Sequence, residues 1–339
     1  MNPSEPRPVP TDEALRAHPT ASARTAGVPT ANEPAANVST AGAAAANAPT
    51  AGARPPIRPR APRLGFDGVR RHWLAGSRAA TQLANGVNLL FPAGERFFIR
   101  SVRSYLDRVS PDLAAQVKGF FGQEGRHAQA HERLFDTLRE QGFDIDSLLE
   151  RYEHLAYDRI EKASPRPLRL AVTVALEHFT AILAEDALTG GVLVHADPEI
   201  RRLLEWHAVE ELEHKAVAFD VLQEVAPSYA LRVAGMALAT LTLGGFWLWA
   251  TRELLAQDGS SLLEARRELA ELRERAVREG ESRVMEPVGK RVFLRGIREY
   301  LRPGFHPMDR DHSALIAATL ARLDAEGVVA ADKSEEAPS

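Results

Sequence analysis

The sequence predicts an all-α protein, in which a four-helix bundle is followed by additional C-terminal helices. Long segments repeat apolar residues at the helical period, and helix-start signals such as Ser110-Pro111-Asp112 precede several of them. No convincing run of alternating apolar and polar residues indicates strands. Of the 339 residues, 45% are hydrophobic and 26% are charged, which is typical of a globular protein.

The composition divides the chain into four parts. Residues 1–62 consist largely of Ala, Pro, Thr and Asn, with too few large apolar residues for a core, which predicts a disordered tail. Residues 63–227 should form the bundle, residues 228–325 a C-terminal helical extension, and residues 326–339 a second disordered tail. Because no apolar segment resembles a secretory signal, the expected location is the cytoplasm.

Pro, Gly and Ser separate the helices expected within the bundle. Ser164-Pro165 and Asp197-Pro198 place Pro in the first turn of a helix, and Gly142 and Gly190 follow the ends of two others. In chain order, the expected helices cover about residues 76–90, 93–108, 111–141, 147–163, 164–190 and 197–226.

Charge and cysteine content exclude several classes of function. The sequence has no cysteine, which excludes disulfides, Cys-ligated zinc, iron–sulfur clusters and a cysteine nucleophile. It also lacks a Gly-x-Ser-x-Gly nucleophile motif. The net charge of −4 gives no indication of nucleic-acid binding. Any bound metal must therefore be held by His, Asp and Glu.

Two Glu-x-x-His motifs lie on the apolar faces of predicted helices. One is Glu124 to His127, and the other is Glu211 to His214, with His207 one turn earlier. At 100° per residue, the Glu and His side chains of each helix fall within an arc of roughly 60°. A buried carboxylate is costly unless it is paired, hydrogen-bonded or bound to a metal. These positions therefore predict metal ligands.

The two preceding helices each add one carboxylate on an apolar face, Glu95 and Glu177. The chain thus reads Glu and then Glu-x-x-His, and repeats that order, as in ferritin-like di-iron and di-manganese bundles. Buried ion pairs that happen to align are the alternative. We predict two metal ions, iron first and Mn or Zn as alternatives. The four glutamates are the candidate catalytic residues, and the predicted ligands are Glu95, Glu124, His127, Glu177, His207, Glu211 and His214.

Three further residues are expected behind these ligands. Gln123 and Glu210 directly precede the motif glutamates and are candidates to orient the histidines, with solvent exposure as the alternative. His131 is either such a supporting residue or a further ligand. His178 points about 100° away from its neighbour Glu177 and is interpreted as structural.

Several of these motifs resemble a bacterial family of predicted metal-dependent hydrolases. The matching phrases are "FPAGERFF", "GQEGRHAQAHERL", "WHAVEELEHKAVAFD" and "YLRPGFHPMD", and the resemblance covers about residues 65–311. It implies a metal-dependent enzyme of unestablished substrate. The resemblance also implies that seven residues occupy positions of the family's motifs: Glu95, Glu124, His127, His131, His207, Glu211 and His214. More distantly, the spacing His207-x-x-x-Glu211-x-x-His214 is similar to the last ligand helix of di-iron arylamine N-oxygenases.

Two chemistries fit this ligand set. A di-iron centre could oxidise a small or lipid-like substrate with O₂, or two metals could activate water for hydrolysis. The Glu-rich ligands favour oxidation, whereas the family description favours hydrolysis. A non-catalytic metal store or ferroxidase is a third hypothesis, against which the helices after Pro227 argue because storage favours a small subunit.

Residues 233–251 form a stretch of 19 residues without charge, and at 1.5 Å per residue it would span roughly 28 Å, about the thickness of a bilayer core. It predicts either a buried helix or contact with the inner membrane, and Gly244-Gly245 would allow close packing of another helix or a homodimer. An apolar surface near the metals would suit a lipid-like substrate.

Overall fold

The computed structural model describes residue 54, residues 56–280 and residues 289–329. Within these residues the protein is all-α, as predicted, and extended pairing is limited to one isolated bridge between Leu74 and Ala196. Residues 1–53, most of the predicted N-terminal tail, and residues 330–339 of the predicted C-terminal tail lie outside the described part of the chain.

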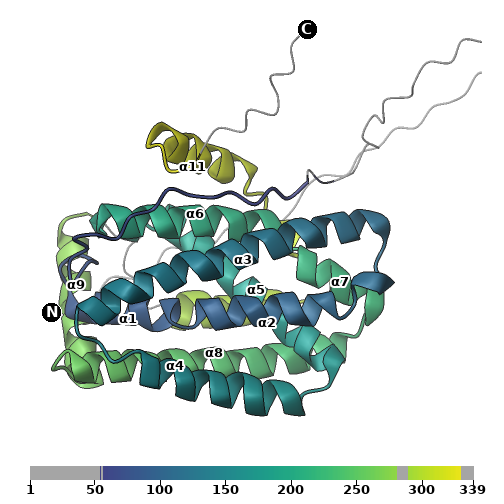
Figure 1. The fold of residues 1–339 in the computed structure, drawn as a ribbon, viewed down its shortest axis with the longest axis horizontal. Helices are drawn as coiled ribbons and strands as arrows, with labels where there is room; N and C mark the ends of the chain where they lie inside the picture. Colours follow the sequence, from purple (N-terminus) through teal and green to yellow (C-terminus); the bar gives the residue numbers. More distant parts are fainter. Residues whose placement is uncertain (1–53, 55, 281–288, 330–339) are drawn as a thin grey trace, which may run out of the picture. The chain divides into compact units, whose positions relative to one another are not determined.

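The helices follow the predicted order (Figure 1). Two π-helical segments, η2 (His154–Glu161) and η5 (Gly289–Leu294), lie among them. The α-helices are α1 (Arg78–Asn88), α2 (Phe91–Arg103), α3 (Pro111–Glu140), α4 (Asp146–Glu153), α5 (Arg166–Thr189), α6 (Pro198–His214), α7 (Val217–Val225), α8 (Tyr229–Gln257), α9 (Leu262–Arg278), α10 (Arg295–Tyr300) and α11 (Ser313–Ala325).

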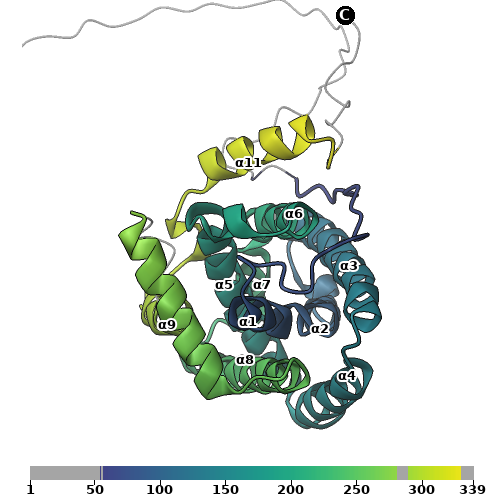
Figure 2. The same ribbon diagram turned by 90° about the vertical axis from the view of Figure 1, so that its left-hand side faces the viewer.

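Four of these helices form a closed group. The helix α2 packs on α3, α5 packs on α6, and the two pairs join through α2 with α5 and α3 with α6. Figure 2, which looks along these helices, shows α3 and α6 on one side of α2 and α5, and α8 on the other. The predicted ligand helices are therefore neighbours.

Helix boundaries differ from the prediction in two places. The helix expected over 93–108 ends at Arg103, and a 3₁₀ turn follows at Leu106–Arg108. The single helix expected over 197–226 is interrupted after His214, between α6 and α7. At this turn the buried Lys215 extends its ammonium group to the carbonyl of Arg310, 2.6 Å away, in the C-terminal extension.

Helix α8 contains the uncharged stretch 233–251 and covers α5 and α1. It approaches α5 closely at Gly235, where an added Cβ would lie 2.5 Å from the backbone of Ala171. The opposite face is exposed, with Leu241 at 73% and Leu248 at 58% of full exposure. By length and composition α5 and α8 could each cross a membrane, but the apolar window of α5 is 67% buried and that of α8 only 28%.

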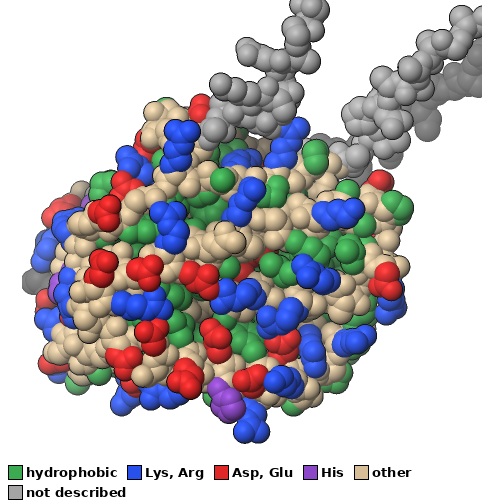
Figure 3. Space-filling model, in the orientation of Figure 1, with side chains coloured by type: hydrophobic (Ala, Val, Ile, Leu, Met, Phe, Trp, Pro, Cys, Tyr) green, Lys and Arg blue, Asp and Glu red, His purple; other side chains and the backbone are tan. Residues whose placement is uncertain are grey.

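The face of the molecule seen in Figure 1 carries charges of both signs (Figure 3). Lys and Arg side chains predominate toward the lower right of that view, near the end of α2 and the start of α5.

Two segments at the predicted tail boundaries contact the bundle. Arg60, within the predicted tail 1–62, forms hydrogen bonds and ion pairs with carboxylates of α6. At the other boundary Glu326 pairs with Arg201 and Arg202, and the carbonyl of Val328 accepts from the backbone N–H of Arg63 at 2.7 Å. The packed chain thus begins before residue 63 and continues past residue 325.

Candidate metal centre

The seven predicted ligands converge between α2, α3, α5 and α6. Each is buried, with at most 4% of its surface exposed. Glu95 comes from α2, Glu177 from α5, and the remaining ligands from α3 and α6. The helical period explains the convergence, because residues three or four apart project from one face and here that face is turned inward.

One half of the site is formed by Glu95, Glu124 and His127, which offer ligand atoms within 4.8 Å of one another. His207 extends this half, because its Nε2 lies 3.6 Å from Glu95 Oε1 and 2.9 Å from Glu211 Oε1. His207, which the sequence predicts as a third histidine ligand, therefore lies among the other predicted ligands.

The other half of the site is formed by Glu124, Glu177 and His214, again within 4.8 Å of one another. Glu124 belongs to both halves. Glu211 also lies between them, because its Oε1 is 3.7 Å from His127 Nδ1 and 3.6 Å from His214 Nε2. The two motif glutamates therefore lie between the two halves, with His127 and His207 in one half and His214 in the other.

Unpartnered polar atoms test whether these residues suit a metal. Among the described residues, both carboxylate oxygens of Glu95, Glu124 and Glu177 are buried without a hydrogen-bond partner, as are His127 Nδ1 and His214 Nε2. Leaving so many buried acceptors unsatisfied is costly in a folded protein. Carboxylate oxygens and imidazole nitrogens form a ligand set for first-row divalent metals, so the residues fit two such ions.

Burial and neighbouring charges shift several pKa values at the site. Burial, with repulsion from neighbouring carboxylates, raises the pKa of Glu95 and Glu124 well above the ordinary range, and burial raises the pKa of Glu177 to about 8. Burial alone would lower the pKa of His214, but attraction to Glu211 and Glu177 raises it to about 9. Burial opposes ionisation of Glu211, yet His214 and His207 hold its pKa well below the ordinary value. Two divalent cations would neutralise the four carboxylates.

Glu210 and Gln123 each contact the histidine of the opposite motif. Glu210 accepts from His127 Nε2 at 3.0 Å, which leaves His127 Nδ1 free to face the centre. Gln123 Oε1 accepts from His214 Nδ1 at 2.9 Å, which leaves Nε2 facing the centre. Such contacts fix the tautomer and ring orientation of a metal-binding histidine. Burial raises the pKa of Glu210 to about 7, against the opposing attraction of Arg60.

His131 lies directly behind His207. Its Nε2 is 2.7 Å from His207 Nδ1, so His207 can donate through Nδ1 and keep the lone pair of Nε2 for the centre. Phe91 contacts both rings, at 5.0 Å between ring centroids. His131 also falls within 4.8 Å of Glu95 and His207 in one candidate ligand group. Burial lowers its pKa well below the ordinary value, so it stays neutral.

Arg60 and Glu213 belong to the site but were not predicted. Arg60 donates to Glu210 through its backbone N–H at 2.9 Å, and its guanidinium makes two bonds of 2.7 Å to Glu213. Glu213 in turn accepts from the amide of Gln123 at 2.7 Å. The only sequence signal is a change from Ala and Thr to Arg and Pro at about residue 54.

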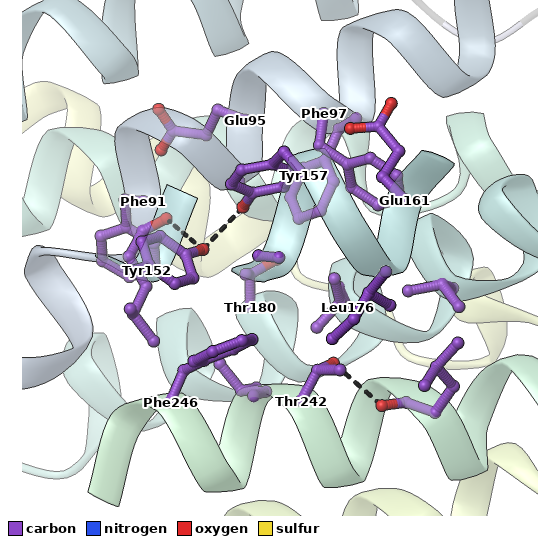
Figure 4. Close-up of a pocket in the computed structure, with 18 of the residues that line it drawn as sticks. Phe91, Glu95, Phe97, Tyr152, Tyr157, Glu161, Leu176, Thr180, Thr242 and Phe246 are labelled. Atoms are coloured by element: carbon purple, nitrogen blue, oxygen red, sulfur yellow. Dashed lines mark hydrogen bonds between the residues drawn. The ribbon is translucent and has the colours of Figure 1, made fainter. Parts of the chain in front are cut away.

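An apolar cavity borders the centre between α2, η2, α5 and α8. Glu95 and Glu211 are the two predicted ligands that line it. Figure 4 shows Glu95 beside the paired hydroxyl groups of Tyr152 and Tyr157, which lie 2.6 Å apart. A substrate in the cavity would thus meet the centre from the side of α2 and α5.

Comparison with known proteins identifies the family. A family model described as "Predicted metal-dependent hydrolase" matches residues 58–311, a range that includes every predicted ligand and Arg60. The searches of curated proteins and of solved structures found no match. Because the family match covers well over half of the sequence, this chain belongs to the family of predicted metal-dependent hydrolases.

Proposed function

We propose that this protein is an enzyme with a ferritin-like, carboxylate-bridged di-metal centre, in which iron is the working metal and an apolar substrate is oxidised with O₂. The observation that carries the proposal is the set of buried, unpartnered Glu and His atoms beside an apolar cavity. When bound, two such metal ions supply either redox chemistry with O₂ or Lewis-acid activation of water.

The chain's own residues position and protect this chemistry. Glu124 and Glu211 would bridge the ions, and His127, His207 and His214 would bind them at the ends. The hydrogen bonds behind these histidines hold each ring in one tautomer, so little rearrangement is needed when a metal enters. The apolar walls of the cavity exclude water from the reacting part of a substrate.

The choice of oxidation rests on the ligand set. Four carboxylates and three imidazoles offer oxygen and nitrogen donors, and the two Glu-x-x-His helices follow the di-iron bundle pattern. The added His207 is similar to the third histidine of di-iron arylamine N-oxygenases. The alternative is hydrolysis by di-metal-activated water, which the description of the family favours.

Metal content and oxygen consumption test the proposal. The wild-type chain should bind about two metal ions, and Glu124→Ala and Glu211→Ala should each lose at least one. Glu140→Ala, at an exposed position of α3, is the matched control and should retain both. Unchanged metal content in both ligand variants would reject the site.

The second arm distinguishes the chemistries. Anaerobically reduced, iron-loaded protein should consume O₂ on mixing, and zinc-loaded protein should not. Hydrolysis of esters or amides by anaerobic zinc- or manganese-loaded protein, without O₂ uptake by the iron form, would instead support the hydrolase alternative. Uptake of many iron ions per chain would indicate storage.

A further inference from the structure

The cavity beside the centre is long and narrow. On α5, its lining residues run from Arg169 to Leu183, and 14 steps of 1.5 Å make roughly 21 Å. Its volume is about 100 Å³, which is too small for a polycyclic ligand and takes a long flexible chain only where the walls part or the chain extends beyond them. The facing wall is formed by four residues of α8, Leu238, Thr242, Leu243 and Phe246.

The middle of the cavity has no free polar group among its lining residues other than the metal ligands. The hydroxyl of Thr180 donates to the carbonyl of Glu177, and that of Thr242 donates to the carbonyl of Leu238. The hydroxyls of Tyr152 and Tyr157 bond each other. The remaining wall there is hydrocarbon, so an apolar chain could bind to it without forming hydrogen bonds.

One end of the cavity is positively charged. Arg169 donates to the carbonyls of Ser164 and Lys162, and no carboxylate of the described residues pairs with it. Glu161, the carboxylate that lines this end, is paired with Arg100 at 2.6 Å. Lys162 lies exposed beside them and is paired with Asp158 at 2.7 Å, which leaves Arg169 as the cation of this end that has no carboxylate partner among the described residues.

The predicted ligands lie along the cavity and away from this charged end. Glu177 is eight residues beyond Arg169 on α5, which is roughly 12 Å along the helix axis. Figure 4 shows Glu95 toward the end that carries Phe91 and Tyr152, and Glu161 toward the other. A ligand anchored at Arg169 would thus place the middle of its chain at the centre.

We propose that the cavity binds a linear amphiphile, an alkyl or acyl chain with an anionic head group at Arg169 and its chain extended along α5 past Glu95 and Glu211. This assignment rests on the proposed function for the reacting position only; the binding itself does not require it. A fatty acid is the simplest ligand of this class.

Gly94 provides a way to block the cavity. It lines the wall on α2, and an added Cβ would meet only the Tyr157 hydroxyl, at 3.9 Å. Gly94→Ala should therefore fit, whereas the longer side chain of Gly94→Leu should occupy the space of the ligand. Arg169→Gln removes the charge at the end, and Arg169→Lys restores it.

The experiment is isothermal titration of the metal-loaded protein with palmitate, 1-hexadecanol and hexadecylamine. Palmitate should bind at one per chain, and the alcohol and amine at least about tenfold more weakly, because neither can form the charge-assisted hydrogen bond that a carboxylate forms with Arg169. Gly94→Leu should abolish binding and Arg169→Gln should weaken palmitate to the level of the alcohol, whereas Gly94→Ala and Arg169→Lys should bind like the wild type.

Metal content measured on the same samples separates the two proposals. Full metal content without palmitate binding, or with equal binding of all three ligands, would overturn the amphiphile assignment and leave the di-metal proposal intact. Palmitate binding that is unaffected by Gly94→Leu would show that the ligand lies elsewhere. One palmitate per chain in a protein that binds no metal would support the cavity assignment and reject the di-metal centre.

Discussion

Arg60 joins the two hydrogen-bond relays that orient His127 and His214. It contacts Glu210, which accepts from His127, and Glu213, which accepts from the amide that holds His214. Its charge also balances two carboxylates that would otherwise lie together at the back of the site. A residue outside the four ligand helices thereby influences both ends of the centre.

Arg60→Ala should lower metal affinity by roughly 10–100-fold, the usual effect of removing a contact behind a ligand. Arg60→Lys keeps the charge but cannot form the paired bonds to Glu213, so it should recover only part of the affinity. Competition with a chelator, with melting temperature measured in parallel, checks this. Arg63→Ala, an exposed neighbour, is the control, and equal affinities in Arg60→Ala and Arg63→Ala would contradict the role.

A second residue-scale prediction concerns pH. In the metal-free protein the pKa of Glu177 is raised to about 8 and that of His214 to about 9, so the folded state holds these protons more tightly than the unfolded state. Their stabilisation is present at low pH and is lost as pH rises. Between pH 6.5 and 8 the free energy of unfolding should therefore fall, by up to about 1.4 kcal/mol per pH unit for each proton.

Urea unfolding of metal-free protein across this pH range measures the slope. Glu177→Gln, which does not titrate, should reduce the slope by the contribution of one proton, and two equivalents of metal should remove it because the ions replace the protons. If the free energy of unfolding of the metal-free protein instead increased with pH, the carboxylates would be ionised in the folded protein.

The ligands could be predicted from the sequence because each is a polar residue at a helix position where an apolar residue is expected. Glu95, Glu177 and the Glu-x-x-His residues are polar groups on otherwise apolar helix faces, and the helical period alone brings each set inward. Arg60 lies outside the helices, so no such pattern singles it out. It lies in a Pro-rich segment, and its partners are 150 and 153 residues away, a contact that periodicity cannot reveal.

At the scale of helices, the contact between α5 and α8 depends on a glycine that the sequence did not single out. Within this chain an added Cβ would meet only Phe293, at 3.9 Å, for Gly244 and nothing within 4 Å for Gly245, so close packing at Gly244-Gly245 stays a prediction for a second copy of the chain. Gly235 is the position pressed against backbone, at Ala171. Both positions look alike in sequence because only the register of two distant helices decides which glycine is crowded.

Gly235→Ala should destabilise the protein by about 1–3 kcal/mol, because the added methyl meets backbone that cannot rotate away. Gly245→Ala, on the open face of the same helix, should stabilise it by up to about 1 kcal/mol through helix propensity. Denaturant unfolding should show changes of opposite sign in the free energy of unfolding of the two variants. Equal effects would place α8 in a different register.

Helix ends show a similar limit. The starts at Pro111 and Pro198 follow local signals and were predicted closely, whereas the interruption after His214 was not. Lys215 leaves the helix to reach Arg310 and His312, which are 95 and 97 residues further on. Local propensity could not anticipate a partner that far along the chain.

For the molecule as a whole, the remaining question is the exposed face of α8. Val233, Ala237, Leu241, Gly245 and Leu248 form an uncharged stripe on it, and the cavity lies against the opposite face of the same helix. A soluble helix rarely leaves such a stripe uncovered, and each large apolar side chain gains roughly 1.5–3 kcal/mol when buried. We expect this stripe to contact a lipid surface, which would also place the cavity near amphiphilic ligands.

Flotation of the untagged protein with phospholipid vesicles tests this last prediction. The wild type should float with the vesicles, and Leu248→Glu should remain in the soluble fraction because a charged side chain resists transfer into lipid. Leu263→Glu is a matched control, because Leu263 on α9 is exposed to the same extent, 58%, and lies outside the stripe. Equal flotation of the two variants would show that the stripe does not contact the lipid. A wild type that stays soluble and is dimeric by light scattering, with Leu248→Glu monomeric, would show that a second copy of the chain covers the stripe instead of lipid.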